Sequence, residues 1–250
     1  MLTIAEKERY DRQILLEEIG PAGQEKLRQA KVFICGAGGL GSPAALYLAA
    51  AGIGTVKIID HDRVSRSNLN RQILHGEGDI DRFKVDSARD CLNRFNPCVT
   101  IETCTETLAA DNAAALLAGF DVVIDALDNL DTRSILNKAV MNLGIPLIHG
   151  AVNGFEGRVL TILPGRSACL RCMHAGPSAP SARFPIIGVT PAVIGAIQAT
   201  EAIKLLLGIG DLLLGRLIVY DGLRLRWTEF KVKLNPDCDH CGHLQQKEGP

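Results

Sequence analysis

The chain has 250 residues with 27 Lys and Arg against 28 Asp and Glu, which leaves a net charge of −1. Hydrophobic residues make up 47% and charged residues 22%, a balance that excludes an intrinsically disordered chain. The near-zero charge gives no overall attraction to nucleic acid or to an anionic membrane surface.

The first 30 residues are predicted to be helical. Thr3 followed by Glu6 fits a capping box at the start of a helix that includes Tyr10 and Leu15. Gly20 and the proline after it are expected to end this helix. A second short helix is expected at residues 24–29.

Strands and helices are predicted to alternate from residue 31 to residue 150. Short apolar runs bounded by turn residues predict buried parallel strands, and apolar residues at helical spacing predict the helices between them. The predicted strands are residues 32–35, 56–59, 99–103, 121–125 and 146–150, and the predicted helices are residues 42–51, 81–95, 111–117 and 132–143, the last with Thr132 as N-cap. This alternation predicts an α/β, Rossmann-like, mostly parallel sheet with helices on both faces.

The pattern changes after residue 150. A strand at 157–163, a loop at 166–185, a helix at 192–207 and strands at 217–220 and 225–232 predict antiparallel strands added to the sheet in the C-terminal half. We therefore expect a single domain over residues 1–250, with N-terminal helices (1–30), a nucleotide-binding half (31–150) and a second half (151–250) that ends in a cysteine-bound tail.

The location is expected to be cytoplasmic. The uncharged run 32–56 is long enough to span a bilayer, but its many glycines and its proline favour a strand, a turn, a helix and a further turn. The N-terminus mixes acidic and basic residues and has no apolar signal core.

A glycine-rich loop follows the first predicted strand. Gly36, Gly38 and Gly41 satisfy the dinucleotide fingerprint, in which glycines let the backbone approach phosphate oxygens at a helix N-terminus. Asp60 ends the next strand, where its carboxylate can accept hydrogen bonds from ribose hydroxyls. These residues alone fit a nicotinamide dinucleotide and ATP equally well.

Three charged residues favour the triphosphate. Arg71, Lys84 and Asp128 each lie in or near a segment that follows a strand, and such segments meet at the carboxyl edge of a parallel sheet. A triphosphate site needs cations and a carboxylate for Mg²⁺, whereas a hydride-transfer site does not. Each residue taken singly could also be a solvated surface charge, so their shared location carries the prediction.

Two Cys-x-x-Cys pairs, Cys169 with Cys172 and Cys238 with Cys241, predict a closed structural zinc site without a catalytic role. A redox dithiol is the alternative, and His174, His240 and His243 are less favoured substitute ligands. The remaining cysteines, Cys35, Cys91, Cys98 and Cys104, are expected to be small buried residues, and His149 an interior hydrogen-bonded histidine.

The ordered motifs resemble the ThiF/MoeB/HesA adenylyltransferases, the bacterial relatives of ubiquitin-activating enzymes. The matching segments are GAGGLGSP at 36–43, IIDHD at 58–62, SNLNRQ at 67–72, Lys84 and DALDNLDTR at 125–133, and the resemblance extends from RYDRQ at 9–13 to the terminal cysteine pair. It implies ATP- and Mg²⁺-dependent adenylylation of the C-terminal glycine carboxylate of a small ubiquitin-like sulfur carrier. Pyrophosphate would be released, and the activated carrier would serve sulfur transfer in molybdopterin, thiamine or related biosynthesis.

The resemblance also implies roles for individual residues. Gly39 and neighbouring amides (Gly36, Gly38 and Gly41) would hold phosphates, Asp60 would bind ribose, Asn68, Arg71 and Lys84 would contact the triphosphate, and Asp128, with Asn129 beside it, would bind Mg²⁺. Asp62, Ser67 and Gln72 belong to the same matching segments and are expected to contribute to nucleotide binding. The family is usually homodimeric, and the arginine that matches Arg12 reaches the ATP site of the other subunit. The resemblance also implies zinc at the four cysteines.

One departure limits the expected chemistry. Family members that form a thioester or acyl disulfide carry a cysteine before a GV-x-x-P-x-x-G stretch, which here is residues 188–195, but the corresponding upstream position is Phe184. Adenylylation alone is therefore expected, with sulfur supplied by a separate sulfurtransferase. An NAD-dependent oxidoreductase, a non-catalytic scaffold for a ubiquitin-like partner, and a relative that acts on tRNA remain alternatives, and the identity of the carrier stays open.

Overall fold

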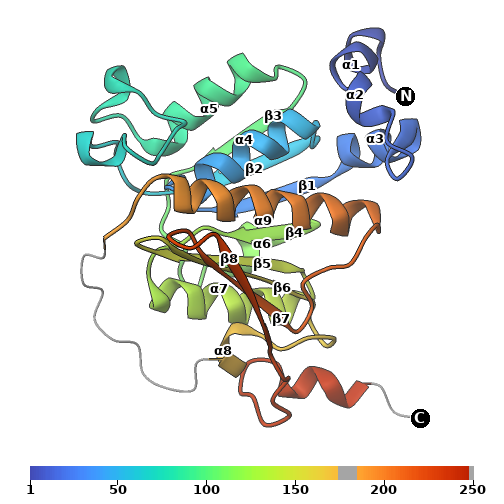
Figure 1. Ribbon diagram of the computed structural model, residues 1–250, viewed down its shortest axis with the longest axis vertical. Helices are drawn as coiled ribbons and strands as arrows, with labels where there is room; N and C mark the ends of the chain where they lie inside the picture. Colours follow the sequence, from blue (N-terminus) through green and yellow to red (C-terminus); the bar gives the residue numbers. More distant parts are fainter. Residues whose placement is uncertain (174–184, 248–250) are drawn as a thin grey trace.

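One twisted sheet runs through the computed structural model, which describes residues 1–173 and 185–247 (Figure 1). Its strand order is β3-β2-β1-β4-β5-β6-β7-β8. The pairs among β1 to β5 are parallel, and β5 to β8 pair antiparallel, as predicted for the two halves. The strands are β1 (Lys31–Cys35), β2 (Thr55–Ile59), β3 (Thr100–Cys104), β4 (Val122–Asp125), β5 (Leu147–Asn153), β6 (Glu156–Ile162), β7 (Arg216–Asp221) and β8 (Arg226–Lys231).

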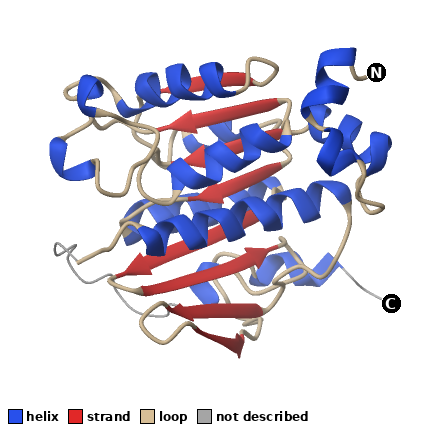
Figure 2. Cartoon of the chain, turned by 45° about the horizontal axis from the view of Figure 1, so that its top comes forward, coloured by secondary structure: helices blue, strands red, loops and turns tan. Residues whose placement is uncertain are grey.

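Helices cover both faces of the sheet (Figure 2). The helices α4, α5 and α9 pack on one face, and α6, α7 and α8 on the other. The helix bounds are α1 (Ile4–Arg9), α2 (Asp11–Ile14), α3 (Gly20–Gln29), α4 (Gly41–Ala51), α5 (Lys84–Phe95), α6 (Ala113–Leu117), α7 (Leu130–Leu143), α8 (Leu170–Met173) and α9 (Val189–Leu207), with 3-10 turns at Arg66–Asn68, Glu77–Asp79 and Gly242–Lys247.

The central strands are mostly apolar because both of their faces are buried. In β1, Val32 and Ile34 pack under α4 and α9, while Phe33 and Cys35 pack against the layer that contains α6 and α7. Side chains alternate between the two faces of a strand, so a strand covered on both sides favours apolar residues at successive positions. This explains the continuous apolar runs in the sequence.

The N-terminal helices differ from the prediction. The capping box of Thr3 and Glu6 is present, but α1 ends at Arg9 because the chain turns at Tyr10. The phenol oxygen of Tyr10 is buried and accepts a hydrogen bond from Asn96 Nδ2 (2.9 Å). Gly20 and Pro21 begin α3 and do not end the first helix. Proline is tolerated in the first turn of a helix, where its missing N–H has no intrahelical partner.

The start of α7 also corrects the prediction. Asn129, and not Thr132, is its N-cap, because the Asn129 side chain accepts a hydrogen bond from the backbone N–H of Thr132 (2.9 Å). The helix therefore begins two residues before the predicted N-cap, immediately after Asp128. Asp128 therefore lies directly before the N-cap of α7.

The longest apolar segments pack inside the molecule. The uncharged run 32–56 forms β1, α4 and the start of β2. In the described part of the chain, α9 is the one helix long and apolar enough to cross a membrane by length and composition. It packs against α4, β5 and β6, as a core helix of a folded domain does.

The free cysteines are not all buried. Cys35 is buried, and Cys91 and Cys104 are partly buried, but Cys98 is exposed, so the expectation of a buried residue was wrong there. Cys98 lies in the turn between α5 and β3, where its backbone N–H donates to Asn96 Oδ1 (3.2 Å). His149 is buried and hydrogen-bonded, as predicted.

Candidate active site

A cleft of about 570 Å³ opens at the carboxyl ends of the parallel strands. It lies where β1 has β2 on one side and β4 on the other, the point at which open α/β sheets bind ligands. Most of the predicted nucleotide-binding residues line it: Gly36, Gly38, Gly39, Asp60, Asp62, Arg71, Gln72, Lys84, Asp128 and Asn129. Of the other predicted residues, Gly41, Ser67, Asn68 and Arg12 do not line it.

The glycine loop depends on close backbone packing. Gly36 has φ +107°, and a Cβ there would lie 2.8 Å from the carbonyl oxygen of Ala126. A Cβ on Gly41 would lie 1.8 Å from the carbonyl oxygen of Gly36, so Gly41 serves to close the turn. The N-terminus of α4 has no side-chain cap, which leaves the partial positive charge of the helix end available to an anion.

Asp60 braces the loop from the end of β2. Its Oδ2 accepts the backbone N–H of Ala37 (2.8 Å), and its Oδ1 accepts that of Asp62 (2.9 Å). Lys84 begins α5 and is only 6% exposed, with Nζ 2.7 Å from Asp62 Oδ2 and 3.9 Å from Asp60 Oδ2. The wall of the cleft thus holds a buried cation in a fixed position.

His75 supports the loop from behind and was missed in the sequence. Its Nε2 lies 3.1 Å from the carbonyl oxygen of Ala37, and its Nδ1 lies 2.9 Å from Ser87 Oγ. Burial lowers the pKa of His75, so the ring is neutral at physiological pH. Because a carbonyl only accepts, Nε2 carries the proton and donates to Ala37.

Arg71 follows the 3-10 turn at Arg66–Asn68. One guanidinium nitrogen of Arg71 donates to the carbonyl of Ser67 (2.8 Å) and to Asn70 Oδ1 (3.0 Å). Asn68 Oδ1 accepts the backbone N–H of Ser65 (3.0 Å), so Asn68 shapes the turn. Within the described ranges, Arg71 forms no ion pair, which leaves its positive charge uncompensated beside the cleft.

Asp128 contributes a negative charge to the cleft that Arg71 also lines. It is exposed, lines the cleft and makes no hydrogen bond or ion pair with any part of the chain that the structure describes. A free carboxylate at a strand end is a suitable ligand for a hard divalent cation.

The start of α9 closes on the glycine loop, a contact that sequence reasoning did not foresee. A Cβ on Gly195 would lie 2.6 Å from the carbonyl oxygen of Leu40, and a Cβ on Gly188 would lie 2.3 Å from the carbonyl oxygen of Asn70. Pro191 packs on Gly39 and lines the cleft. The glycines of residues 188–195 thus permit close backbone contact with both nucleotide-site loops.

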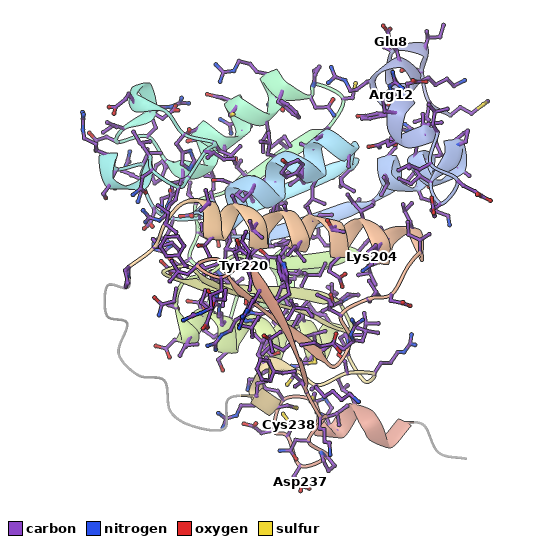
Figure 3. All side chains as sticks on the ribbon, viewed as in Figure 1. Glu8, Arg12, Lys204, Tyr220, Asp237 and Cys238 are labelled. Carbon is purple, nitrogen blue, oxygen red and sulfur yellow. The ribbon has the colours of Figure 1, made fainter. Side chains whose placement is uncertain are left out.

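The four predicted cysteines converge outside the cleft. The sulfur atoms of Cys169 and Cys172 are 3.9 Å apart, those of Cys169 and Cys238 3.7 Å, and those of Cys172 and Cys241 3.5 Å. A tetrahedral zinc with Zn–S bonds of about 2.3 Å requires sulfur separations of about 3.8 Å, so the donor set fits that metal. Cys238 lies at the end of the molecule opposite the N-terminal helices that carry Arg12 (Figure 3).

The two described histidines near the cysteines are not part of the cysteine cluster. His240 Nδ1 pairs with Asn137 Nδ2 (2.8 Å), and His243 is exposed. Neither belongs to the group of side chains that could hold the metal ion. His174 and Phe184 lie outside the described residues.

Comparison with known proteins decides the family. The ThiF family model matches residues 10–240. This chain belongs to the ThiF family. It is 42% identical to the SAMP-activating enzyme E1 of Haloferax volcanii, over 96% of this chain and 91% of that protein. It is 41% identical to the sulfur carrier protein adenylyltransferase of Thermus thermophilus, over 96% of this chain and 92% of that protein.

Solved structures support the same fold for this ThiF family chain. Escherichia coli MccB in complex with ATP matches 94% of this chain and 74% of its own, with a TM-score of 0.84 and 22% identity. PaaA matches 92% of this chain and 75% of its own, with a TM-score of 0.80 and 27% identity. At 22% identity, the likeness to MccB shows the fold alone.

Proposed function

We propose that this ThiF family protein adenylylates the C-terminal glycine carboxylate of a small ubiquitin-like sulfur carrier, with ATP and Mg²⁺ as co-substrate and cofactor. The observation that carries the proposal is that Arg71, Lys84 and Asp128 line one cleft together with the glycine loop. The names of the relatives, with identities of 41% and 42%, support the same activity.

The reaction needs charge compensation more than it needs a base. A terminal carboxylate has a reference pKa of about 3.3–3.7 and is ionised at neutral pH. A carboxylate oxygen attacks the α-phosphorus of ATP. The bond between that phosphorus and the oxygen that bridges the α- and β-phosphates breaks, and pyrophosphate leaves with the electron pair of that bond. Arg71 and Lys84 would offset the charge of the two anionic reactants and of the leaving group.

The remaining cleft residues would bind and orient the nucleotide. Amides of the glycine loop and the start of α4 would bind phosphates, and Asp60 would accept hydrogen bonds from the ribose. Asp128 would hold Mg²⁺, with Asn129 beside it. The ion would neutralise triphosphate charge.

Zinc at the four cysteines would have a structural role. A site closed by four thiolates has no coordination position left for a substrate. The ion would link the C-terminal tail, through Cys238 and Cys241, to α8, which supplies Cys172.

We infer a homodimer as the working form, as the resemblance to the ThiF/MoeB/HesA family implies. The exposed Arg12 does not line the cleft of its own chain, which is compatible with that form. Arg12 would complete the site of the other subunit. One sheet joins both halves of the chain, which supports treating residues 1–250 as one adenylation domain. We further propose a cytoplasmic location and a separate sulfurtransferase as the sulfur source.

Pyrophosphate–ATP exchange with a panel of candidate carriers tests this function. We expect exchange with a carrier that ends in Gly-Gly and none with the same carrier shortened by its last glycine. A panel of molybdopterin, thiamine and related carriers identifies the pathway. Absence of carrier-dependent exchange, together with tight binding of a nicotinamide dinucleotide, would contradict the proposal and favour an oxidoreductase.

A further inference from the structure

A buried ion pair lies directly beneath the segment that carries Asp128. Asp125, the last residue of β4, has no exposed surface, and Arg133 on α7 places Nε 3.3 Å from its carboxylate. His149 Nδ1 lies 2.7 Å from Asp125 Oδ2, and because a carboxylate only accepts, this nitrogen donates. These three side chains come from β4, α7 and β5, and only Arg133 lines the cleft.

The carboxylate is charged despite its burial. Burial alone would raise the pKa of Asp125, but the Arg133 charge and the His149 hydrogen bond outweigh it and hold the pKa below its usual value. The pair is therefore a fixed dipole inside the protein, and not a group that titrates near neutral pH.

The pair holds both backbone polar groups of Leu127 by hydrogen bonds. Asp125 Oδ1 accepts the backbone N–H of Leu127 (3.1 Å), and Arg133 Nη2 donates to the carbonyl oxygen of the same residue. The same Arg133 nitrogen also donates to the carbonyl of Gly150 (2.7 Å), which ties the segment to β5. Leu127 immediately precedes Asp128, so these contacts fix the backbone from which the Asp128 side chain projects.

The residues on both sides of Leu127 and Asp128 are also held by hydrogen bonds. The N–H of Ala126 donates to the carbonyl of Cys35 on β1 (3.1 Å), and Asn129 is committed as the N-cap of α7. Asp128 is thus the one residue between Ala126 and Asn129 whose side chain has no partner in the described protein. This is the arrangement of a preorganised ligand.

We propose that Arg133 and Asp125 are positioning residues that orient Asp128 for the divalent cation. The inference rests on the proposed function of Asp128 and adds residues that act on it through the backbone. Outer contacts that orient a metal-binding carboxylate commonly change metal affinity by about 10–100-fold when they are removed.

Two conservative variants test the pair without removing its volume. Arg133→Lys keeps the charge but replaces the planar fork with one ammonium group, which cannot serve three acceptors at different places. Asp125→Asn keeps the shape but removes the charge at a residue that cannot reach a ligand. Glu201→Gln is the matched control, because Glu201 is also a buried, ion-paired carboxylate, on α9 and outside the cleft.

The first measurement does not depend on activity. Hydrogen–deuterium exchange of the peptide that covers residues 126–128 should be faster in Arg133→Lys and Asp125→Asn than in the wild type, and unchanged in Glu201→Gln. Unchanged exchange in both variants would overturn the inference, because the pair would then not hold the segment.

The second measurement is a Mg²⁺ titration of carrier-dependent pyrophosphate–ATP exchange. Both variants should need about tenfold more Mg²⁺ or higher for half-maximal rate, with ATP affinity measured without Mg²⁺ little changed. If only Arg133→Lys responds, and it loses ATP affinity without Mg²⁺, Arg133 contacts the nucleotide directly and the inference is wrong. An inactive wild type would refute the proposed function instead, and hydrogen exchange would still decide whether the pair holds residues 126–128.

Discussion

Arg71 and Asp128 differ from Lys84 in how the protein compensates their charges. Lys84 is buried between two carboxylates, whereas Arg71 and Asp128 have no counter-ion among the described residues. Removing Lys84 would leave Asp60 and Asp62 without their cation, so its loss affects stability as well as activity. Arg71 and Asp128 are better probes of the proposed function because neither pairs with another charge of the described chain, so their loss should disturb the fold least.

Arg71→Ala should lower carrier-dependent pyrophosphate exchange about 10²-fold or more while the protein melts at nearly the same temperature. The physical reason is the loss of a preorganised positive charge at the cleft. The control is Arg66→Ala, which removes an exposed arginine of the same turn that pairs with Glu77 and does not line the cleft. Equal activity of the two variants would show that Arg71 is an ordinary surface charge.

Asp128→Asn should abolish most of the exchange activity and weaken its dependence on Mg²⁺, because an amide binds a divalent cation less well than a carboxylate does. Asp131→Asn, on the first turn of α7, removes a nearby exposed carboxylate outside the cleft and should behave as the wild type. A normal Mg²⁺ response in Asp128→Asn would rule out Asp128 as the ligand.

At the scale of elements, β4, β5 and α7 are joined by polar contacts as well as by apolar packing. Gln198 on α9 adds to them, with Nε2 donating to the carbonyls of Asp125 (2.7 Å) and Ile148 (3.0 Å). Buried polar groups of this kind are costly unless they are paired, so the Gln198 amide nitrogen favours the positions of these two carbonyls, while its Oε1 has no partner among the described residues. The carboxyl edge of the sheet is therefore held in one arrangement.

The Asp125 ion pair should make stability depend on pH in a defined direction. The pKa of Asp125 is lowered in the folded state, so its contribution is present above the unfolded-state pKa of about 3.9 and is lost as pH falls through the lower folded-state value. The stability difference between wild type and Asp125→Asn should thus be large at pH 7 and shrink below about pH 4. Urea unfolding of both proteins across this range measures it, and a difference independent of pH would contradict the ion pair.

At the scale of the whole molecule, the two predicted sites are separate. The cysteine cluster packs on the face of the sheet that carries α7 and α8, while the cleft opens at the carboxyl edge. If the cluster binds zinc as proposed, removal of the ion should therefore affect the fold of the tail before it affects the chemistry.

Cys241→Ser should lower the zinc content of the purified protein from about one ion per chain and lower its melting temperature, since a structural zinc stabilises the loops that it joins. Cys98→Ser is the matched control, because Cys98 is exposed and outside the cluster. Full zinc content in Cys241→Ser, measured by mass spectrometry, would exclude the four-cysteine site.

The dimer can be tested by mixing two inactive variants. If Arg12 of one subunit completes the site of the other, Arg12→Ala and Asp128→Asn subunits that exchange at random should regain about a quarter of the wild-type activity. Half of the dimers would be mixed, and each would contain one intact site. No recovery after verified subunit exchange would mean that Arg12 acts elsewhere.

The sequence by itself determined the order of motifs, the alternation of strands and helices and the residue types of the cleft, because these follow from local spacing and from the burial of both sheet faces. Only the tertiary structure showed that His75 braces Ala37, that Arg133 and Asp125 grip Leu127, and that the start of α9 closes on the glycine loop. These contacts join segments far apart in the chain. A single hydrogen bond, or a glycine that permits close backbone contact, produces no repeating pattern in the sequence from which such a contact could be predicted. The N-cap of α7 was misplaced for a related reason, since Asn129 and Thr132 are both good capping residues and the path of the chain after β4 selects between them.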